Sequence, residues 1–281
     1  MATKQIPKRC IWCLKKPPSA TFDSESHVLP ECVGNIKKQV LPPGIVCDDC
    51  NHYFGVKVEP ALIDDPIFAT IVGILQLRDK NREFVYEHSP SGVHRDIYVD
   101  TNVSGNKVTV TTQYKIHGQP SRLYEDRFIP PKSKDYDKRS LALLSRAVHK
   151  IAFESLAHSL FVGTGLKKEH IDLKNIDIFD SSFNAVREWV RYGAPQRSVR
   201  PVLRIQKIDE IRTQEEFFHW QGKLLYFQQW FRYELSLFGD WYIMSLTSPA
   251  DKADGDLRSW TKRTEFKHPV LMFSDKIQKI I

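Results

Sequence analysis

The sequence has no hydrophobic run that could cross a membrane. Its longest apolar stretch, residues 67–77, is interrupted by Thr70, Gly73 and Gln76, whereas a transmembrane helix needs about 20 mostly apolar residues. Residues 1–9 are basic and contain no apolar core of signal-peptide length. We therefore expect a cytoplasmic protein with no membrane partner.

Cysteine is scarce, and all five cysteines lie before residue 51. A secreted disulfide framework usually spreads its cysteines over the whole domain, so this clustering argues against one. Four of them form two Cys-x-x-Cys pairs, a spacing typical of a tetrahedral zinc site. Such a site has no open coordination position, so it stabilises a fold and carries no catalysis. We predict a structural Zn2+ held by Cys10, Cys13, Cys47 and Cys50, with Cys32 as a small core residue beside it.

Acidic residues are outnumbered by basic ones. The chain has 41 Lys and Arg against 34 Asp and Glu, a formal net charge of +7 and a pI near 9.0. One zinc ion with four thiolates would add about −2 and leave the chain basic. With 41% hydrophobic residues the chain can bury a core. The charge favours an anionic partner, and nucleic acid is the first candidate.

The first sixty residues are expected to form a β-β-α unit. Residues 20–29 and 36–46 read as two strand arms with a turn signal at Gly34-Asn35. Asp48 and Asp49 favour a helix N-terminus, and a short helix over 50–58 would end or kink at Pro60. A further helix at about 66–77 is expected to pack on this unit.

The remaining chain predicts a larger α+β region. Period-two patterns between residues 82 and 128 favour an antiparallel sheet, with a hairpin turn at residues 104–106. Helical spacing predicts helices over 138–161 and 182–192, the second capped at residues 180–181. Strands are expected within 199–211, 223–248 and 270–273. The fold class is therefore α+β, with an N-terminal finger at 1–64, an accessory domain at 65–281 and a linker near 129–138.

One histidine near the cysteine pairs has a candidate chemical role. His27 ends the first expected strand, while Asn51, His52 and Glu59 follow on the expected helix. Residues seven or eight apart share a helix face, so Asn51 or His52 can present a metal ligand together with Glu59. A hydrated divalent ion beside a neutral histidine forms a hydrolytic site, in which the histidine takes a proton from water. The simpler alternative is that His27 is a surface or outer-shell imidazole.

The motifs occur in a specific order. They read Cys-x-x-Cys, Ser-His-Val-Leu-Pro, Val-Gly-Asn, then Cys-x-x-Cys-Asn-His-Tyr-Phe-Gly and Glu-Pro. This order, over residues 10–59, resembles the zinc-stapled HNH endonucleases of the ββα-metal fold. The resemblance implies a nuclease that hydrolyses phosphodiester bonds with Mg2+ or Mn2+. Carried over by position, it implies His27 as general base, Asn51 as a helix-borne metal ligand, and Glu59 as a further ligand with His52 as the competing choice.

The sequence departs from that family at the residue before the base. An acidic metal ligand commonly precedes it, but here the position is Ser26. Glu25 is one place early, and on a strand it should point to the face opposite to Ser26. Three explanations stay open: a bulge turns Glu25 inward, Ser26 binds the metal weakly or through water, or the site is degenerate. Asn35 is the only candidate for the family's middle asparagine, and it falls in a predicted turn.

Several arginines between residues 187 and 200 alternate with the aromatic residues Trp189 and Tyr192. Arginine can bind phosphate and aromatic rings can stack on bases, so this segment suits a nucleic acid. Its alternative is a solvated helix face plus a loop. The candidate nucleic-acid-binding residues are Arg187, Arg191, Arg197 and Arg200.

The leading hypothesis is a metal-dependent HNH endonuclease acting on double-stranded DNA, whose C-terminal region contributes substrate binding or regulation. A homodimer would suit paired cuts in a duplex, and bacterial or phage defence is a context by analogy only. The alternative is a zinc-finger nucleic-acid-binding protein without catalysis, for which Ser26 is the best argument.

Overall fold

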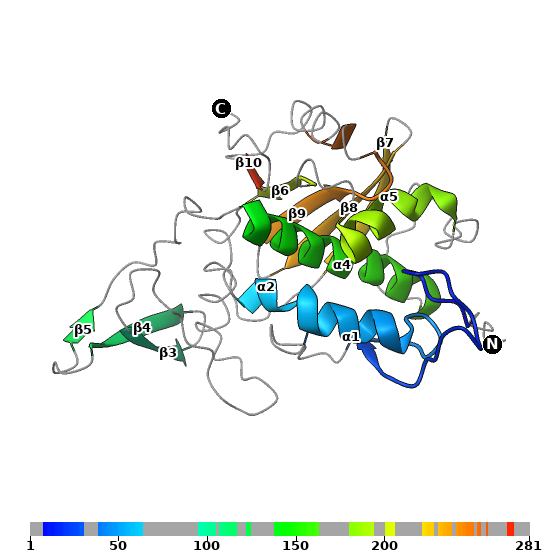
Figure 1. Cartoon of the computed structure of the whole chain (residues 1–281). Coiled ribbons are helices and arrows are strands. Elements are labelled where there is room, and N and C mark those ends of the chain that lie inside the picture. The colour runs from blue at the N-terminus through cyan, green and yellow to red at the C-terminus, as the bar shows by residue number, and fades with distance from the viewer. Residues whose placement is uncertain are drawn as a thin grey trace.

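The computed structural model describes residues 8–30, 39–63, 95–104, 107–116, 122–124, 138–162, 180–193, 200–205, 221–227, 230–237, 240–249, 252–253, 257 and 269–272. Helices and antiparallel sheets occur together, so the predicted α+β class is confirmed (Figure 1). The helix expected at 66–77, the linker near 129–138 except for its last residue, and Cys32, Asn35 and Arg197 lie outside these ranges.

The N-terminal unit has the predicted β-β-α order. Strand β1 (Ser26–His27) pairs antiparallel with β2 (Val40–Leu41), so that His27 faces Val40 in the register. Helix α1 (Asp48–Lys57) follows, with Asp48 and Asp49 in its first turn as the helix dipole favours. Helix α2 (Pro60–Ile63) begins at the proline, whose missing N–H costs nothing in a first turn.

The two strands are much shorter than expected from residues 20–29 and 36–46. The main chain before β1 bonds to a side chain of α1 and not to a neighbouring strand. The amides of Asp23 and Ser24 donate to the Asp48 carboxylate at 3.0 and 2.8 Å. These two amides therefore have a hydrogen-bond partner without a neighbouring strand, and the β1–β2 ladder does not extend to them.

The C-terminal region contains an antiparallel five-stranded sheet of order β10-β6-β9-β8-β7. The predicted strand regions 199–211, 223–248 and 270–273 all contribute to it. Its strands are β6 (Val202–Ile205), β7 (Gln221–Phe227), β8 (Trp230–Leu237), β9 (Asp240–Ser245) and β10 (Pro269–Met272).

A second, three-stranded antiparallel sheet has the order β3-β4-β5. Ser104 pairs with Lys107, so two residues connect β3 to β4, where the hairpin turn was predicted. The strands are β3 (Arg95–Ser104), β4 (Lys107–Ile116) and β5 (Arg122–Tyr124).

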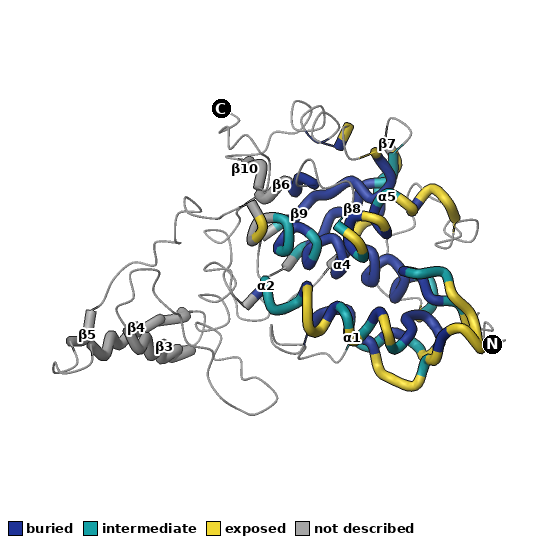
Figure 2. Tube along the Cα trace, viewed as in Figure 1, coloured by how far each residue is buried: buried dark blue, intermediate teal, exposed yellow. Residues whose placement is uncertain are grey.

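Helix α4 (Lys138–Val162) is the longest helix among the described residues, and it lies between the five-stranded sheet and α1 (Figure 1). The helix is almost wholly buried from Leu144 to Ser159, as the dark blue tube in Figure 2 shows. A helix on the surface would bury one stripe. This helix buries polar as well as apolar faces because it has neighbours on both sides.

The segment predicted as one helix over 182–192 changes its winding along its length. It comprises the 3-10 turn η3 (Ser181–Phe183), α5 (Asn184–Arg187) and the π-helix η4 (Glu188–Tyr192). Asp180 accepts the Ser182 amide at 3.0 Å, which confirms the predicted cap. Gly193 ends the segment at φ 68°, in the left-handed region that glycine tolerates.

A chain of aromatic contacts joins the N-terminal unit to the sheet. Trp12 contacts Phe54 of α1 at 4.9 Å and Phe153 of α4 at 5.0 Å between ring centroids. Phe153 then contacts Phe183 at 5.4 Å, and Phe183 stacks on Phe231 of β8 at 5.8 Å. The N-terminal unit and the C-terminal region therefore share one hydrophobic core. None of the helices that the structure describes has the length and apolarity of a membrane span.

Close packing at Gly222 gives a test of this core. A Cβ added at Gly222 would lie 1.7 Å from the hydroxyl oxygen of Tyr233, which is fully buried and has little room to move. We predict that Gly222→Ala lowers the free energy of unfolding by about 1–3 kcal/mol, the usual cost of overpacking. Thermal denaturation measures this.

Gly55→Ala is the matched control, because nothing lies within 4 Å of a Cβ there and the position is helical. It should leave the melting temperature unchanged or raise it slightly. An equal response of the two variants would contradict the contact between Gly222 and Tyr233.

Candidate functional site

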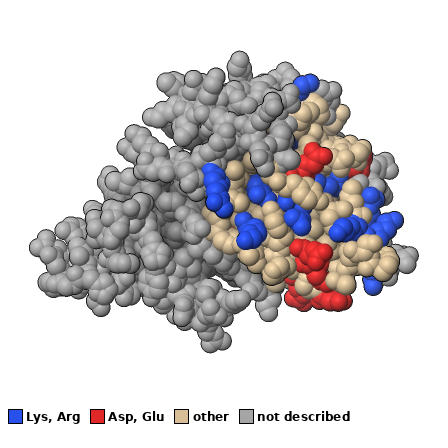
Figure 3. Space-filling view, viewed as in Figure 1, with Lys and Arg blue, Asp and Glu red and all other residues tan. Residues whose placement is uncertain are grey.

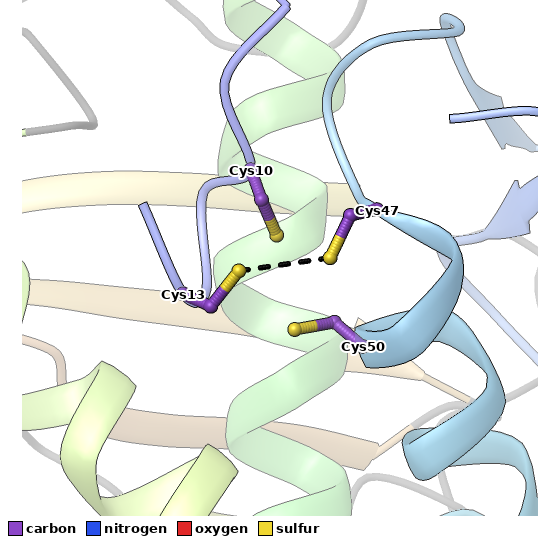
Figure 4. Close-up of side chains that lie close together, drawn as sticks. All are labelled: Cys10, Cys13, Cys47 and Cys50. Carbon is purple, nitrogen blue, oxygen red and sulfur yellow. Dashed lines mark hydrogen bonds between the residues drawn. The ribbon is translucent and has the colours of Figure 1, made fainter. Parts of the chain in front are cut away.

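The four paired cysteines converge at one point (Figure 4). Their sulfur atoms all lie within 4.8 Å of one another, and those of Cys13 and Cys47 are 3.6 Å apart. Tetrahedral zinc with Zn–S bonds of about 2.3 Å requires sulfurs separated by about 3.8 Å. The cluster therefore fits a structural metal such as zinc, as its spacing predicted.

Two local structures hold the sulfurs together. The first pair sits on a tight turn, in which the amide of Leu14 donates to the carbonyl of Cys10 at 2.9 Å and Leu14 adopts φ 61°. The second pair brackets the start of α1: Cys47 precedes the helix, and Cys50 lies in its first turn. The amide of Ile11 donates to Ile45 at 2.9 Å and brings the two pairs into contact.

The thiols also influence one another's protonation. Hydrogen bonding with Cys10 lowers the pKa of Cys13, and the same residue raises the pKa of Cys50. Like charges so close together cannot all develop without a compensating cation. The donor set therefore suits a metal that binds thiolates.

The residues of α1 anchor the chain that leads into His27. Ser24 donates to the Asp48 carboxylate through its hydroxyl at 2.6 Å, and this bond is the main reason for the lowered pKa of Asp48. Asn51 donates through Nδ2 to the carbonyl of Glu25 at 2.8 Å and to the hydroxyl of Ser24 at 3.2 Å. Asn51 therefore lies beside the segment that carries His27, although they are far apart in the sequence.

The three residues around the candidate base alternate in exposure. Glu25 is exposed, Ser26 is 3% exposed and His27 is half-buried. Ser26 Oγ has no hydrogen-bond partner among the described residues. The alternation is that of extended chain, in which every second side chain shares a face. Glu25 and His27 are therefore both accessible to solvent, whereas Ser26 is buried.

The other two candidate ligands lie in different surroundings. His52 is exposed on α1, whereas Glu59 is half-buried directly before α2. Glu59 Oε1 lies 2.8 Å from Nζ of Lys150 in α4. A candidate metal ligand of the N-terminal unit is thus in an ion pair with the C-terminal region.

Lys150 is the centre of a buried polar cluster. Its ammonium donates to the carbonyl of His27 at 2.7 Å and lies 2.8 Å from Glu154 Oε2. Trp12 donates to Glu154 Oε1 at 2.9 Å. Burial raises the pKa of Glu154 to about 7. Burial alone would lower the pKa of Lys150, but Glu154 and Glu59 raise it above its ordinary value.

Two of the predicted nucleic-acid-binding arginines are in the interior. Arg187 is 3% exposed and donates to the carbonyls of Ile11 and Asp180 at 2.7 and 2.8 Å. Arg200 is 1% exposed and donates to the carbonyls of Ser245 and Ser248. The prediction placed both on a surface, but their guanidinium groups satisfy main-chain oxygens inside the fold. In this arrangement they are not available to a phosphate.

Arg191 differs from these two. Its guanidinium lies 3.9 Å from the ring centroid of Tyr53 and 5.4 Å from that of Tyr192, whose side chain is 60% exposed. Arg146 donates to the hydroxyl of Tyr53 and to the carbonyl of Val190. Of the predicted arginines within the described ranges, Arg191 is therefore the one beside an exposed aromatic ring.

A comparison with family models identifies the N-terminal unit. Residues 10–67 match the HNH endonuclease family. The resemblance stated from the sequence is confirmed for this HNH segment, which contains all four clustered cysteines. No curated protein and no solved structure matches the chain. The match of this segment to the HNH endonuclease family supports nuclease activity in general and implies a nucleic-acid substrate.

Sequence reasoning missed the contribution of α4 to this region. Neither Lys150 nor Glu154 was predicted to be part of the site. The signal was present, because they are spaced i, i+4 between apolar residues on a helix with little polar surface. The sequence cannot show that Glu59 and His27 lie opposite this pair.

The cysteine cluster predicts a strong dependence of folding on metal. We expect Cys47→Ser to lose one bound zinc and to unfold the HNH segment, because structural zinc supplies on the order of 10 kcal/mol of apparent binding free energy. Elemental analysis and thermal denaturation measure the two effects.

Cys32→Ser is the matched control, since it makes the same chemical change at a cysteine not assigned to the cluster. It should retain one zinc per chain. Full zinc content and an unchanged melting temperature in Cys47→Ser would contradict the four-thiolate site.

Proposed function

We propose that this chain is a metal-dependent endonuclease that hydrolyses phosphodiester bonds in double-stranded DNA. The observation that carries the proposal is the family match over residues 10–67 together with the contact of α1 and the chain that leads into His27. Metal-assisted hydrolysis needs a base close to a bound divalent ion, and the contact between Asn51 and the segment that leads into His27 supports such a site.

In this proposal His27 is the general base that takes a proton from the attacking water. Asn51 and Glu59 hold a hydrated Mg2+ or Mn2+, with His52 as the alternative to Asn51. The amide nitrogen of Asn51 is engaged with Ser24 and Glu25, which leaves its Oδ1 as the atom for a cation. The bound ion would stabilise charge on the phosphate and the leaving oxygen.

Glu25 is our candidate for the acidic ligand that the sequence lacks at position 26. It is exposed on the side of His27, and its main chain is held to α1 by Asn51. Ser26 is buried, which argues against a metal contact from that residue. The alternation of exposure over residues 25–27 supports Glu25 on the side of His27 without a bulge.

The charge of the molecule supports an anionic substrate. Lys and Arg are spread over the described face in Figure 3, with smaller groups of acidic side chains among them and at its lower edge. Arg191 with Tyr53 and Tyr192 offers a cation and a ring for phosphate and base contacts. A homodimer that cuts both strands, a cytoplasmic location and a role in bacterial or phage defence stay predictions.

The activity is tested with supercoiled plasmid in Mg2+ or Mn2+. Wild-type protein should nick or linearise the plasmid, and His27→Ala should lower the rate by about 100-fold or more, because general-base catalysis contributes that much. Zinc content and melting temperature show that the variant is folded.

Cleavage that survives His27→Ala would exclude it as the base. If the wild type binds DNA but does not cut it with any divalent ion, the result would favour the non-catalytic zinc-finger binding protein, which the buried Ser26 also suggests.

Arg191→Ala tests the substrate surface. Loss of one phosphate contact should weaken DNA binding and reduce the slope of log affinity against log salt by about 1. Fluorescence anisotropy at several salt concentrations measures both. Lys252→Ala, which removes the same charge from an exposed residue of the C-terminal region, serves as the control. An identical response of the two variants would remove Arg191 from the interface.

A further inference from the structure

Lys150 has a saturated set of partners. An ammonium group has three donors, and three oxygens lie within 2.8 Å of its nitrogen: the carbonyl of His27, Glu59 Oε1 and Glu154 Oε2. The side chain is 1% exposed. It therefore lacks the access to contact a substrate, and its chemistry is confined to holding these groups in place.

The three partners come from different parts of the site. His27 is the proposed base, and Glu59 is a proposed metal ligand. Glu154 lies one turn further along α4 and accepts a hydrogen bond from Trp12, which stands between Cys10 and Cys13 in the zinc turn. The ammonium of Lys150 thus contacts the proposed base and the proposed metal ligand directly, and Glu154 links it to the turn that carries Cys10 and Cys13.

Stability alone does not explain a lysine in this place. A buried ion pair is often no more stable than apolar side chains of similar volume, because desolvation offsets the attraction. The interior around it could accommodate such residues, since α4 also buries Ile151 and Phe153. A charged group at this junction, in contact with both His27 and Glu59, points to a role in the site.

We propose that Lys150 is a positioning residue of the nuclease centre, which fixes the carboxylate of Glu59 and the main chain of His27 relative to each other. The inference rests on the proposed function and assigns part of the site to the region beyond the HNH segment. Outer partners that orient metal ligands typically contribute 10–100-fold to metal affinity or activity.

The charge of the cluster is compatible with a divalent ion. The Lys150 ammonium is shared between the carboxyl groups of Glu59 and Glu154, so Glu59 does not have to neutralise it alone. Lys150 binds Oε1 of Glu59, and Oε2 is left for the ion. Holding one oxygen restricts the rotamers of the carboxylate, and this lowers the entropy cost of binding the metal.

The test removes the ammonium of Lys150 together with the carboxyl group of Glu154 that it faces. In Lys150→Met/Glu154→Gln both charges of the buried pair are lost, and Glu59 still supplies −1. The amide introduced by Glu154→Gln retains an oxygen for Trp12, so the variant should fold. Glu154→Gln alone is the control, because it keeps Lys150 on Glu59 and His27.

Two readouts are measured on zinc-loaded protein: Mn2+ affinity by electron paramagnetic resonance, and plasmid cleavage at saturating Mn2+. We expect the double variant to bind Mn2+ about 10-fold more weakly than the control and to cleave 10–100-fold more slowly. Zinc content and melting temperature should stay close to those of the control. If Lys150 acts by positioning Glu59, then Lys150→Met/Glu154→Gln should cause little further loss of Mn2+ affinity in a Glu59→Gln background. The reason is that the effects of coupled residues are not additive.

Each contrary result has a distinct meaning. A lower melting temperature with unchanged Mn2+ affinity and cleavage would reduce Lys150 to a structural residue and overturn the inference. If the wild type cuts no DNA but binds Mn2+, the proposed function fails, and the Mn2+ affinities still decide the role of Lys150. If the wild type shows neither, both are overturned.

Discussion

The packing of Trp12 is the contact on which the rest of the structure depends. Its ring lies against Phe54 on one side and Phe153 on the other, and its indole nitrogen donates to Glu154. Trp12 lies between two of the clustered cysteines, so a metal at that cluster fixes the turn that carries it. Through this residue, the small finger becomes continuous with the core of the C-terminal region. A β-β-α unit of this size has little core of its own, and a metal together with a neighbouring helix supplies what it lacks.

Helix α4 lies between the five-stranded sheet and the HNH segment. This position explains why it buries polar as well as apolar residues. On the finger side it buries Lys150 and Glu154, and elsewhere it buries apolar residues together with polar ones such as Ser145 and His149. Most buried polar groups in folded proteins are hydrogen-bonded, and the finger provides partners for the buried ion pair from Trp12, His27 and Glu59. The accessory region is thus joined to the finger by specific polar contacts as well as by apolar packing. Through Lys150, the C-terminal region contacts two residues of the proposed nuclease centre directly.

Part of the structure could be predicted from local patterns. The cysteine spacing predicted the cluster, the acidic residues at 48 and 49 predicted the start of α1, and helical periodicity predicted α4 almost to its ends. The strands of the finger were predicted too long, because the bonds from Asp48 to the preceding loop depend on a contact that periodicity does not report. The arginines at 187 and 200 were misplaced for a similar reason. Their sequence context suggested a surface, but neighbouring segments cover them and offer main-chain carbonyls.

The sequence by itself determined the chemistry that is available: four thiols at zinc spacing, one histidine before Val-Leu-Pro, and helix residues that can bind a metal. These features are local, since a Cys-x-x-Cys turn and the first turn of a helix arise from a few consecutive residues. Only the tertiary structure decided which groups meet. It turned Ser26 inward and Glu25 outward, and it placed Lys150 against both His27 and Glu59, more than ninety residues away in the chain. Such pairings follow from how α4 is buried between two layers, and no short-range pattern in a sequence encodes them.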